Sequence, residues 1–374
     1  MSTEGTSLPV GHKVIVSELA ETPLEAIEKH VSLTEMSPPD VATLSPRDVL
    51  VAVKSASVGW VDLLMTSGQY QHMAKPPYTP GLEYAGEVAW RGSEVPESLA
   101  IGTRVLVDGL LAGPRSLGAY QKWGGWASYA VAPAEAVLPI PGDLSFDEAC
   151  NLLGNYETAY HCLVARGRLR EGETVLIHGA SGSTGLAAVQ VAKQMGATVI
   201  ATGRSPAKLA VVKAQGADHV IDTRGEDGGL RPFRDEVKAL TGGRGVDVVY
   251  DGVGGDISVE SLRCVQFGAR FLIVGWAATP FVAEGKGKRG APNANVLPTN
   301  LIMMKGLDVL GCPTAITTAK DPSIRPPRLA QILAWANAGK IRPYVSHTFP
   351  LTDVIGGMRA KWSGEVIGGA VLHP

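Results

Sequence analysis

Glycine recurs at every third position directly after a short apolar run. Residues 174–178 read Thr-Val-Leu-Ile-His, and Gly179, Gly182 and Gly185 follow before a helical pattern begins. Glycine lets backbone amides come close to a pyrophosphate, and the helix that follows presents the positive end of its dipole to it. A glycine-rich turn without a ligand is the alternative, and the placement between a strand and a helix disfavours it. We therefore expect a dinucleotide-binding turn made of Gly179, Ala180, Ser181, Gly182, Ser183, Thr184 and Gly185.

The end of the next apolar run, 198–202, carries cations where NAD-binding folds place a carboxylate for the ribose 2′-hydroxyl. Gly203, Arg204 and Ser205 come directly after it, and Lys208 follows. A carboxylate there would repel a 2′-phosphate, whereas two cations attract it and a serine hydroxyl can donate to it. The pattern predicts NADPH as the cofactor. The alternative is that both cations merely coat the start of a helix.

Two further predicted strands, over 246–251 and 271–275, end in glycine. In an open α/β sheet the ligand crevice lies beyond the carboxyl ends of the strands, so both ends are placed to line the nicotinamide half of the cofactor. Ordinary turn glycines are the alternative, and it is stronger here than at the first turn. The residues concerned are Gly252, Val253, Gly254, Val274, Gly275 and Trp276.

The elements that must position these turns alternate between helix and strand from residue 147 onward. Further strands are predicted over 219–222 and 306–311, and helices over 147–164, 186–195, 207–215, 234–240 and 327–338. This alternation is typical of βαβ units, so we expect an α/β fold with a doubly wound parallel sheet. Residues 13–146 instead hold short β-like runs between Gly and Pro turns. The runs 344–349 and 370–373 indicate that the chain returns to this first region.

Length, charge and cysteine spacing exclude several classes of protein. The chain has 374 residues, which favours two domains, and its net charge of −2 gives no sign of nucleic acid or an anionic membrane as a partner. Its four cysteines form no CxxC pair, which argues against a zinc ribbon and a disulfide scaffold. Residues 1–9 lack the features of a secretory signal, and no apolar run is long enough to span a bilayer. We expect a cytoplasmic protein.

The whole pattern resembles the medium-chain dehydrogenase/reductase superfamily, and within it the zinc-independent NADPH:quinone oxidoreductase branch. The likeness rests on the segments 61–70, 80–88, 124–129, 157–160 and 241–248, in this order and at these spacings. It implies a Rossmann domain for NADPH over 147–317, and a β-rich GroES-like catalytic domain over 1–146 and 318–374. It also implies a homodimer joined through the edge at 306–312, which light scattering can test.

A zinc ligand of the superfamily is missing from this sequence. Zinc alcohol dehydrogenases carry Gly-His-Glu where this chain has Gly81, Leu82 and Glu83, and they carry a four-cysteine lobe that is absent here. Leucine cannot bind zinc, and alcohol oxidation relies on zinc to activate the hydroxyl. We therefore expect no metal and, instead of alcohol oxidation, hydride transfer to a carbon conjugated with a carbonyl.

The resemblance also implies roles for polar residues of the first region and of the helix after residue 147. Tyr70 matches a tyrosine that enoyl reductases place beside the substrate, so it is the candidate proton donor, with a turn-lining tyrosine as the equal alternative. Asp62 is expected to orient the cleft by hydrogen bonding, or else to serve a helix N-terminus or the surface. Asn155 and Thr158 share a helix face and are expected to contact the nicotinamide half of the cofactor.

Two positions depart from the quinone reductase branch. That branch often has Asn three residues before Asp62 and usually Arg four residues after it, where this chain has Gly59 and Thr66. The substrate pocket is therefore expected to be wider or less polar, with Trp60 narrowing it again. Lys305 either helps to close the cofactor crevice or is a solvated surface lysine.

Three functions follow from these observations. The leading one is an NADPH-dependent reductase of quinones or α,β-unsaturated carbonyl compounds. The second is an enoyl-thioester reductase acting on acyl-CoA, for which the predicted loop 280–298 offers only one basic cluster, Lys286, Lys288 and Arg289. The third is an NADPH-binding structural or interaction protein that has lost turnover, and the departures at positions 59 and 66 keep it open.

Overall fold

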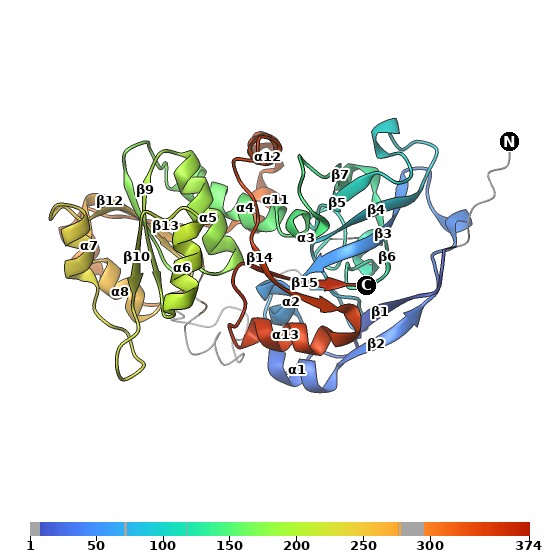
Figure 1. The fold of residues 1–374 in the computed structure, drawn as a ribbon, viewed down its shortest axis with the longest axis horizontal. Helices are drawn as coiled ribbons and strands as arrows, with labels where there is room; N and C mark the ends of the chain where they lie inside the picture. Colours follow the sequence, from blue (N-terminus) through green and yellow to red (C-terminus); the bar gives the residue numbers. More distant parts are fainter. Residues whose placement is uncertain (1–7, 71–72, 117, 276, 278–294) are drawn as a thin grey trace. The chain divides into compact units, whose positions relative to one another are not determined.

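The computed structural model describes residues 8–70, 73–116, 118–275, 277 and 295–374. The chain forms two compact units, which are described separately (Figure 1). The first unit holds Met1–Asn151 and Val345–Pro374, and the second holds Leu152–Tyr344. Within the described residues, every helix is too short or too polar to cross a membrane.

A six-stranded parallel sheet forms the centre of the second unit. Its strands run in the order β10-β9-β8-β11-β12-β13, and each pairs with its neighbour in parallel. Their carboxyl ends therefore meet at one edge, which confirms the predicted doubly wound arrangement. The strands are β8 (Thr174–Ile177), β9 (Thr198–Gly203), β10 (His219–Asp222), β11 (Val246–Asp251), β12 (Val265–Ile273) and β13 (Asp308–Gly311).

Helices cover both faces of this sheet. Figure 1 shows α5 and α6 on one side of the strands and α7 and α8 on the other. On the α7 side, Phe233 and Val237 pack against Leu176 and Ile200 in one apolar core. The helices are α5 (Ser183–Gln194), α6 (Pro206–Ala214), α7 (Arg234–Leu240), α8 (Asp256–Ser261), α10 (Thr299–Met304), α11 (Thr314–Lys320) and α12 (Arg325–Asn337), with η6 (Pro322–Ile324) before α12.

The single helix predicted over 147–164 is wrong. Three elements occupy this stretch: α3 (Phe146–Ala149), α4 (Leu153–Tyr160) and the π-helix η5 (His161–Arg166). A capping box between Ser145 and Glu148 starts α3, and the Asn151 amide donates back to the Asp147 carbonyl at 2.9 Å. These side-chain bonds to the backbone compete with helix continuation, so the chain breaks where apolar spacing alone predicts continuity.

The first unit is built on a seven-stranded sheet of order β14-β15-β3-β4-β5-β7, with β6 paired to β3. The C-terminal strand β15 pairs with β3 in antiparallel register, which confirms the predicted return of the chain. The strands are β3 (Asp48–Ser57), β4 (Tyr84–Arg91), β5 (Arg104–Val107), β6 (Tyr129–Pro133), β7 (Val137–Pro139), β14 (Val345–Pro350) and β15 (Gly369–His373), beside the separate hairpin of β1 (Gly11–Val16) and β2 (Val31–Met36).

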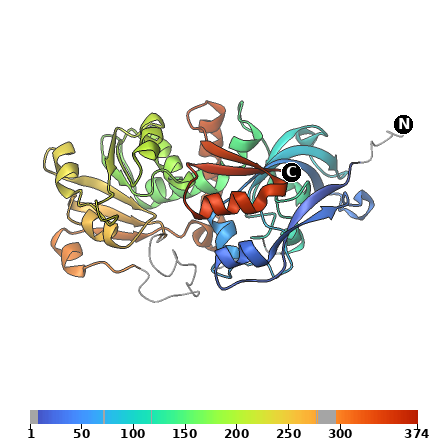
Figure 2. The same ribbon diagram turned by 60° about the horizontal axis from the view of Figure 1, so that its bottom comes forward.

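Three helices of the first unit were not predicted from the sequence. They are α1 (Pro23–Lys29), α2 (Trp60–Met65) and α13 (Val354–Trp362), and α1 and α13 lie side by side (Figure 2). Trp60 of α2 stacks on Trp362 of α13, with ring centroids 5.3 Å apart and planes at 5°. Short helices with one apolar face gain their stability from such contacts, which sequence periodicity does not show. The same unit has the short 3₁₀-helices η1 (Val41–Thr43), η2 (Glu97–Leu99), η3 (Ala119–Lys122), η4 (Ala134–Ala136) and η7 (Leu351–Asp353).

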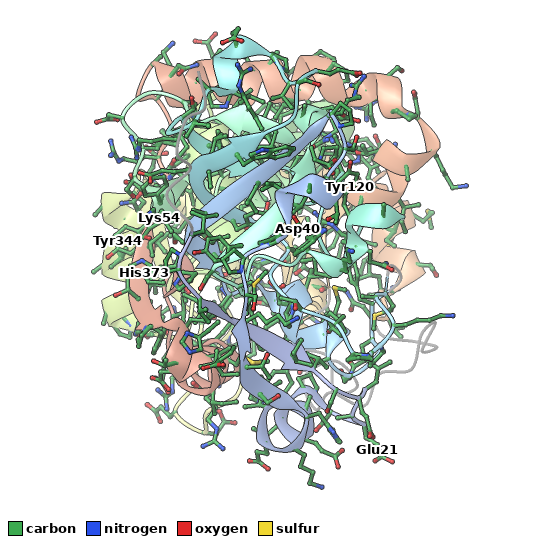
Figure 3. The ribbon with its side chains drawn as sticks, turned by 90° about the vertical axis from the view of Figure 1, so that its right-hand side faces the viewer. Glu21, Asp40, Lys54, Tyr120, Tyr344 and His373 are labelled. Atoms are coloured by element: carbon green, nitrogen blue, oxygen red, sulfur yellow. The ribbon has the colours of Figure 1, made fainter. Side chains whose placement is uncertain are left out.

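Side-chain contacts tie residues 147–151 to the C-terminal strand of the first unit. His373, labelled in Figure 3, lies 2.7 Å from Asp147 Oδ1, so α3 is tied to the C-terminal strand. A Cβ on Gly369 would lie 2.7 Å from Asn151 Oδ1, so the next turn packs on that strand too. Elsewhere in this unit, the hydroxyl of Tyr120, labelled in the same figure, donates to Asp48 Oδ1 at 2.5 Å and anchors η3 to β3. Residues 147–151 therefore pack with the first unit, whereas the sequence-based domain limits at 147 and 317 stay predictions.

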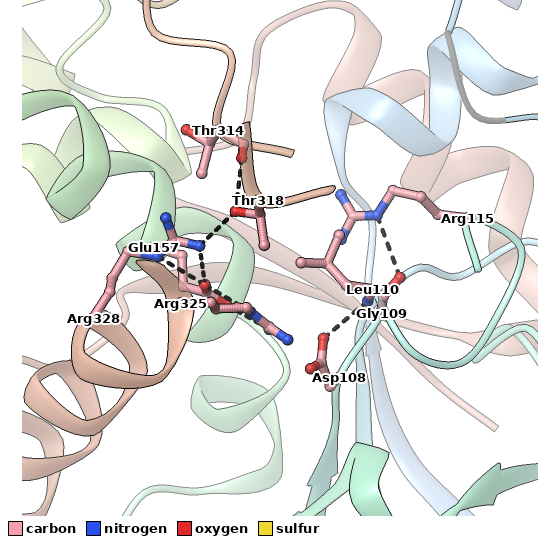
Figure 4. A network of polar contacts seen from close by, with 9 residues as sticks. All are labelled: Asp108, Gly109, Leu110, Arg115, Glu157, Thr314, Thr318, Arg325 and Arg328. Atoms are coloured by element: carbon pink, nitrogen blue, oxygen red, sulfur yellow. Dashed lines mark hydrogen bonds and ion pairs between the residues drawn. The ribbon is translucent and has the colours of Figure 1, made fainter. Parts of the chain in front are cut away.

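A buried ion cluster holds α12 on α4 in the second unit (Figure 4). The Glu157 carboxylate accepts hydrogen bonds from Arg325 and Arg328, each with a shortest distance of 2.7 Å. Arg328 also donates to Thr318 Oγ1 at 2.8 Å. Burial opposes the charged form of Glu157, but the two guanidinium groups lower its pKa from the usual value. These bonds tie α11 and α12 to α4 within the second unit.

Replacing Glu157 by glutamine should leave Arg328, whose side chain is 4% exposed, without its counter-charge. We expect Glu157→Gln to lower the free energy of unfolding by about 3–5 kcal/mol, because an unpaired buried cation is costly. The matched control is Glu236→Gln in the exposed pair with Arg231, for which we expect less than about 1 kcal/mol. Urea unfolding of both variants measures the difference, and equal losses would contradict the ranking.

Candidate functional site

The turn after β8 combines a left-handed glycine with a close contact to a helix. Gly179 has φ +64°, and the N–H of Gly182 donates to its carbonyl at 3.1 Å. A Cβ on Gly185 would lie 2.2 Å from that same carbonyl oxygen, so only glycine allows α5 to begin here. Within the described residues, no side chain caps the N-terminus of the twelve-residue α5. The turn therefore offers what a pyrophosphate needs: glycine at the contact and a helix N-terminus without a competing cap.

The predicted residues Asn155 and Thr158 lie on α4, which packs beside α5. Thr184 Oγ1 donates to Asn155 Oδ1 at 3.0 Å, so Asn155 is fixed to the first turn of α5. Thr158 lies three residues further along α4 and is partly exposed. The structure thus brings Asn155 to the glycine turn. Contacts of either residue with a cofactor stay predictions.

The segment after β9 places its cations around the start of α6. The Ser205 hydroxyl caps α6 and accepts the N–H of Lys208 at 3.5 Å. The exposed Arg204 donates to the carbonyl of Gly228 at 2.6 Å. Gly203 carries the carbonyl that accepts the N–H of Thr223 at 2.8 Å. No carboxylate occupies residues 202–205. The segment thus presents cations and a hydroxyl, and its contact with a 2′-phosphate stays a prediction.

The ends of β11 and β12 are held together by Asp251. Its Oδ1 accepts the N–H groups of Val253 and Gly254, both at 2.9 Å, and its carbonyl accepts those of Val274 and Gly275 at 2.9 and 3.2 Å. Strand β12 ends at Ile273, two residues earlier than predicted. A Cβ on Gly179 would lie 3.1 Å from Val253 Cγ2, so the first and third turns also touch.

The carboxyl edge therefore brings together the predicted turns 179–185, 203–205, 252–254 and 274–275. Trp276, the last predicted residue, lies outside the described residues, as do Lys286, Lys288 and Arg289 and most of the predicted loop. The described end of that loop reaches α8: the amide of Asn295 accepts the N–H of Gly255 at 3.1 Å and donates to Ser258 Oγ at 3.2 Å.

Two buried polar residues at this edge were missed by sequence reasoning. His178 directly follows β8 and Thr202 lies near the end of β9, and both are 1% exposed. The His178 imidazole lies 2.7 Å from Thr202 Oγ1 and 2.6 Å from Ser261 Oγ on α8. Burial lowers the pKa of His178 to about 4, so the ring is neutral at neutral pH. The one available signal was a histidine and a threonine at the ends of adjacent parallel strands.

Asp62 is buried in the first unit and holds a loop in place. Its Oδ1 accepts the N–H groups of Gly81 and Leu82 at 3.2 and 3.1 Å, and its Oδ2 accepts that of Gly59 at 3.0 Å. Burial raises the pKa of Asp62 to about 6, although the three N–H groups and Arg115 favour the charged form. The bond to Gly59 is the helix N-terminal role that the sequence left open, because it caps α2, and the bonds to Gly81 and Leu82 orient a loop. A direct part in catalysis stays a prediction.

The positions that depart from the quinone reductase branch surround Asp62. A Cβ on Gly59 would lie 2.8 Å from Asp62 Oδ2, so a larger residue there would have to displace the carboxylate. Thr66 is fully buried and its hydroxyl donates to the Leu63 carbonyl at 2.7 Å, so it ends α2. Tyr70 follows α2 and is partly exposed. Its role as a proton donor stays a prediction.

Lys305 does not belong to the cofactor edge. Its ammonium donates to the carbonyl of Val265 at 3.3 Å, and Val265 is the first residue of β12. It thus lies at the amino end of the strand, opposite the glycine turns, which corrects the idea that it closes the crevice. Partial burial and the charge of Lys238 lower the pKa of Lys305.

The position that carries a zinc-binding histidine in alcohol dehydrogenases is occupied by an apolar residue here. Leu82 is 4% exposed, and its N–H donates to Asp62 Oδ1. The described part of the chain has no group of three or more His, Cys, Asp or Glu residues that could hold a metal ion. All four cysteines are buried free thiols.

Comparison with known proteins agrees with this geometry. Residues 45–142 match the family model of the alcohol dehydrogenase GroES-like domain, and residues 183–319 match that of the zinc-binding dehydrogenase. A quinone oxidoreductase-like protein 2 homolog of Nematostella vectensis is 33% identical, over 83% of this chain and 77% of its own length. A quinone oxidoreductase of Lama guanicoe is 34% identical, over 84% and 86%.

A solved structure shows the same fold throughout. The crystal structure of a probable oxidoreductase from Mycobacterium abscessus superimposes with a TM-score of 0.77, at 29% identity. The match covers 98% of this chain and 100% of that one. Both units of the present chain are therefore included in the likeness.

The raised pKa of Asp62 predicts a pH-dependent stability. Because the folded protein holds this proton more tightly than the unfolded chain, whose pKa is near 3.8, the stabilisation is complete below pH 3.8 and is lost as the pH rises through about 6. The shift corresponds to about 3 kcal/mol. Tyr78 and Arg115 are the other ionisable groups that act on this carboxyl.

The experiment is urea unfolding of the wild type and of Asp62→Asn between pH 4 and pH 8. The wild type should lose stability relative to the variant by about 2.5 kcal/mol over this range, because asparagine does not titrate. Asp256→Asn, at an exposed position, is the matched control and should run parallel to the wild type. A difference between Asp62→Asn and wild type that stays constant with pH would contradict the prediction.

Proposed function

Because the chain belongs to the medium-chain dehydrogenase/reductase superfamily and is an oxidoreductase, we propose that it is an NADPH-dependent, metal-free reductase of quinones or α,β-unsaturated carbonyl compounds. The observation that carries this proposal is the pairing of an uncapped glycine turn at α5 with the cations after β9. The likeness to a quinone oxidoreductase and to a quinone oxidoreductase-like protein supports the substrate class.

The residues of the carboxyl edge fit a nicotinamide dinucleotide. The turn 179–185 would hold the pyrophosphate, and residues 252–254 and 274–275 would flank the nicotinamide half. Arg204 and Lys208 would pair with a 2′-phosphate, and Ser205 would donate to it. Arg204 would have to exchange its bond to the Gly228 carbonyl for the phosphate, which is a stronger, charge-assisted partner. When bound, the cofactor supplies a hydride.

The residues of the first unit would serve the acceptor. Leu82 leaves no metal ligand at the usual position, which favours acceptors whose carbonyl needs only a proton or a hydrogen bond. Tyr70 would donate to the oxygen on which charge develops, or to the adjacent carbon. Asp62 would act indirectly, as a positioning residue that fixes the loop containing Leu82.

The test of the function is oxidation of NADPH with a panel of 1,4-quinones and enones. We expect turnover with at least one acceptor, unchanged after dialysis against EDTA, and a roughly hundredfold lower kcat for Tyr70→Phe. Tyr129→Phe is the matched control, because that hydroxyl donates to the Pro9 carbonyl at 2.8 Å. NADPH binding without oxidation by any acceptor would favour a non-catalytic role instead.

The choice of cofactor has its own test. Arg204→Ala combined with Lys208→Ala should raise the Kd for NADPH about thirtyfold or more, because two charge-assisted contacts are lost, and should leave the Kd for NADH within about twofold. Lys213→Ala, at the other end of α6, is the matched control. Fluorescence titration measures the Kd of NADPH and of NADH for the wild type, the double variant and the control. Equal weakening of both cofactors would overturn the assignment of the 2′-phosphate site.

We also propose a homodimer formed through β13 and a cytoplasmic location. Strand β13 is the last of the parallel sheet, and an edge strand offers unpaired backbone groups to a second copy. Phe267, Met303 and Met304 lie near its start and are 81%, 73% and 69% exposed, which supports a covered surface there. A monomeric mass by light scattering would contradict the dimer. The location rests on the sequence-based expectation and the free thiols.

A further inference from the structure

A continuous line of hydrogen bonds runs beneath the cofactor turns of the second unit. It begins at Thr202, passes through the His178 ring and Ser261, and ends at the carbonyl of Ile257. The three side chains are each at most 1% exposed, so water does not compete for these bonds. The line joins the ends of β8 and β9 to α8.

The hydrogens in this line can be assigned one by one. The Ser261 hydroxyl donates its single hydrogen to the Ile257 carbonyl at 2.6 Å. Towards His178, 2.6 Å away, Ser261 Oγ can therefore only accept, and the donor must be Nε2–H. A neutral ring with a hydrogen on Nε2 has a lone pair on Nδ1, so Thr202 Oγ1 donates to Nδ1 at 2.7 Å. One tautomer and one direction satisfy every partner.

The two ends of the line are next to the two phosphate-binding segments. His178 immediately precedes Gly179, the first residue of the pyrophosphate turn, and Thr202 immediately precedes Gly203 and Arg204. The ring of Phe233 lies against the imidazole with centroids 5.7 Å apart, so the histidine cannot swing away on that side. The spacing between the two segments is thus set by a side-chain bond in addition to the strand pairing of β8 with β9.

We propose that Thr202, His178 and Ser261 form a positioning relay that sets the distance between the pyrophosphate turn and the 2′-phosphate segment and so determines the preference for NADPH over NADH. The inference rests on the proposed use of NADPH. None of the three touches the reacting atoms; they act through the backbone of Gly179 and Arg204. A ligand that bridges both segments needs this spacing, whereas NADH has no 2′-phosphate and depends on it less.

The experiment compares Thr202→Val, which keeps the shape and removes the hydroxyl, with Thr202→Ser, which keeps the hydroxyl. The probes are adenosine 2′,5′-bisphosphate and AMP, titrated by calorimetry. We expect Thr202→Val to weaken the bisphosphate about tenfold and AMP less than twofold, and Thr202→Ser to match the wild type within about twofold. In turnover, KM for NADPH should rise while kcat stays within about twofold.

Two further measurements separate this relay from a purely structural role. In ¹⁵N spectra of the histidines, His178 should show a protonated Nε2 and an unprotonated Nδ1 at pH 7. Ser261→Ala leaves Nε2–H without its acceptor and should shift the same ligand preference as Thr202→Val. A mere loss of folded protein would lower kcat by the same factor with NADPH and NADH and would leave the Kd of the bisphosphate and of AMP unchanged. This result would overturn the relay.

Arg204→Ala serves as the reference that keeps the two proposals apart. If Arg204→Ala weakens adenosine 2′,5′-bisphosphate but Thr202→Val and Ser261→Ala do not, the relay is refuted and the NADPH assignment stands. If none of the three variants changes the preference for the bisphosphate over AMP, the 2′-phosphate site itself is refuted.

Discussion

The close approach of α5 to the turn after β8 is the constraint on which the carboxyl edge depends. At position 185 even a single Cβ would come within 2.2 Å of the Gly179 carbonyl, so the helix can start there only with glycine. Asn155 is then fixed through Thr184, and Val253 packs against Gly179. Because the neighbouring strands are parallel, the other turns arrive at the same edge. The geometry of the edge where we propose a phosphate-bearing ligand follows from one steric condition and one sheet topology.

Buried polar side chains hold the backbone at the places that matter for this site. Asp251 accepts two N–H groups of the glycine turn after β11, and Asp62 accepts three N–H groups around α2 and Leu82. His178 joins two strand ends and a helix. Burying such groups costs free energy unless each is hydrogen-bonded, and here each has partners. The polar groups therefore define the loop geometry, and the apolar cores supply most of the stability.

The same pair of units can support different chemistry according to a few residues. The segment that carries a zinc-binding histidine in alcohol dehydrogenases holds Leu82 here, with its backbone anchored by a buried carboxylate. Superfamily membership consequently identifies an oxidoreductase, whereas the acceptor has to be argued from the side chains.

The sequence by itself determined the parallel sheet, the glycine turn and the return of the C-terminus, because apolar periodicity and glycine spacing are local properties of the chain. It also showed the cations after β9 and the leucine at the zinc position. Only the tertiary structure decided the break in the helix at 150–152, the placement of Lys305 at the amino end of β12, and the hydrogen bonds of His178. The helix break depends on side-chain bonds to nearby backbone, which apolar spacing does not show. The other two depend on bonds between residues far apart in sequence, such as His178 and Ser261. Burial, which changes what a carboxyl such as Asp62 can do, is likewise a property of the folded chain alone.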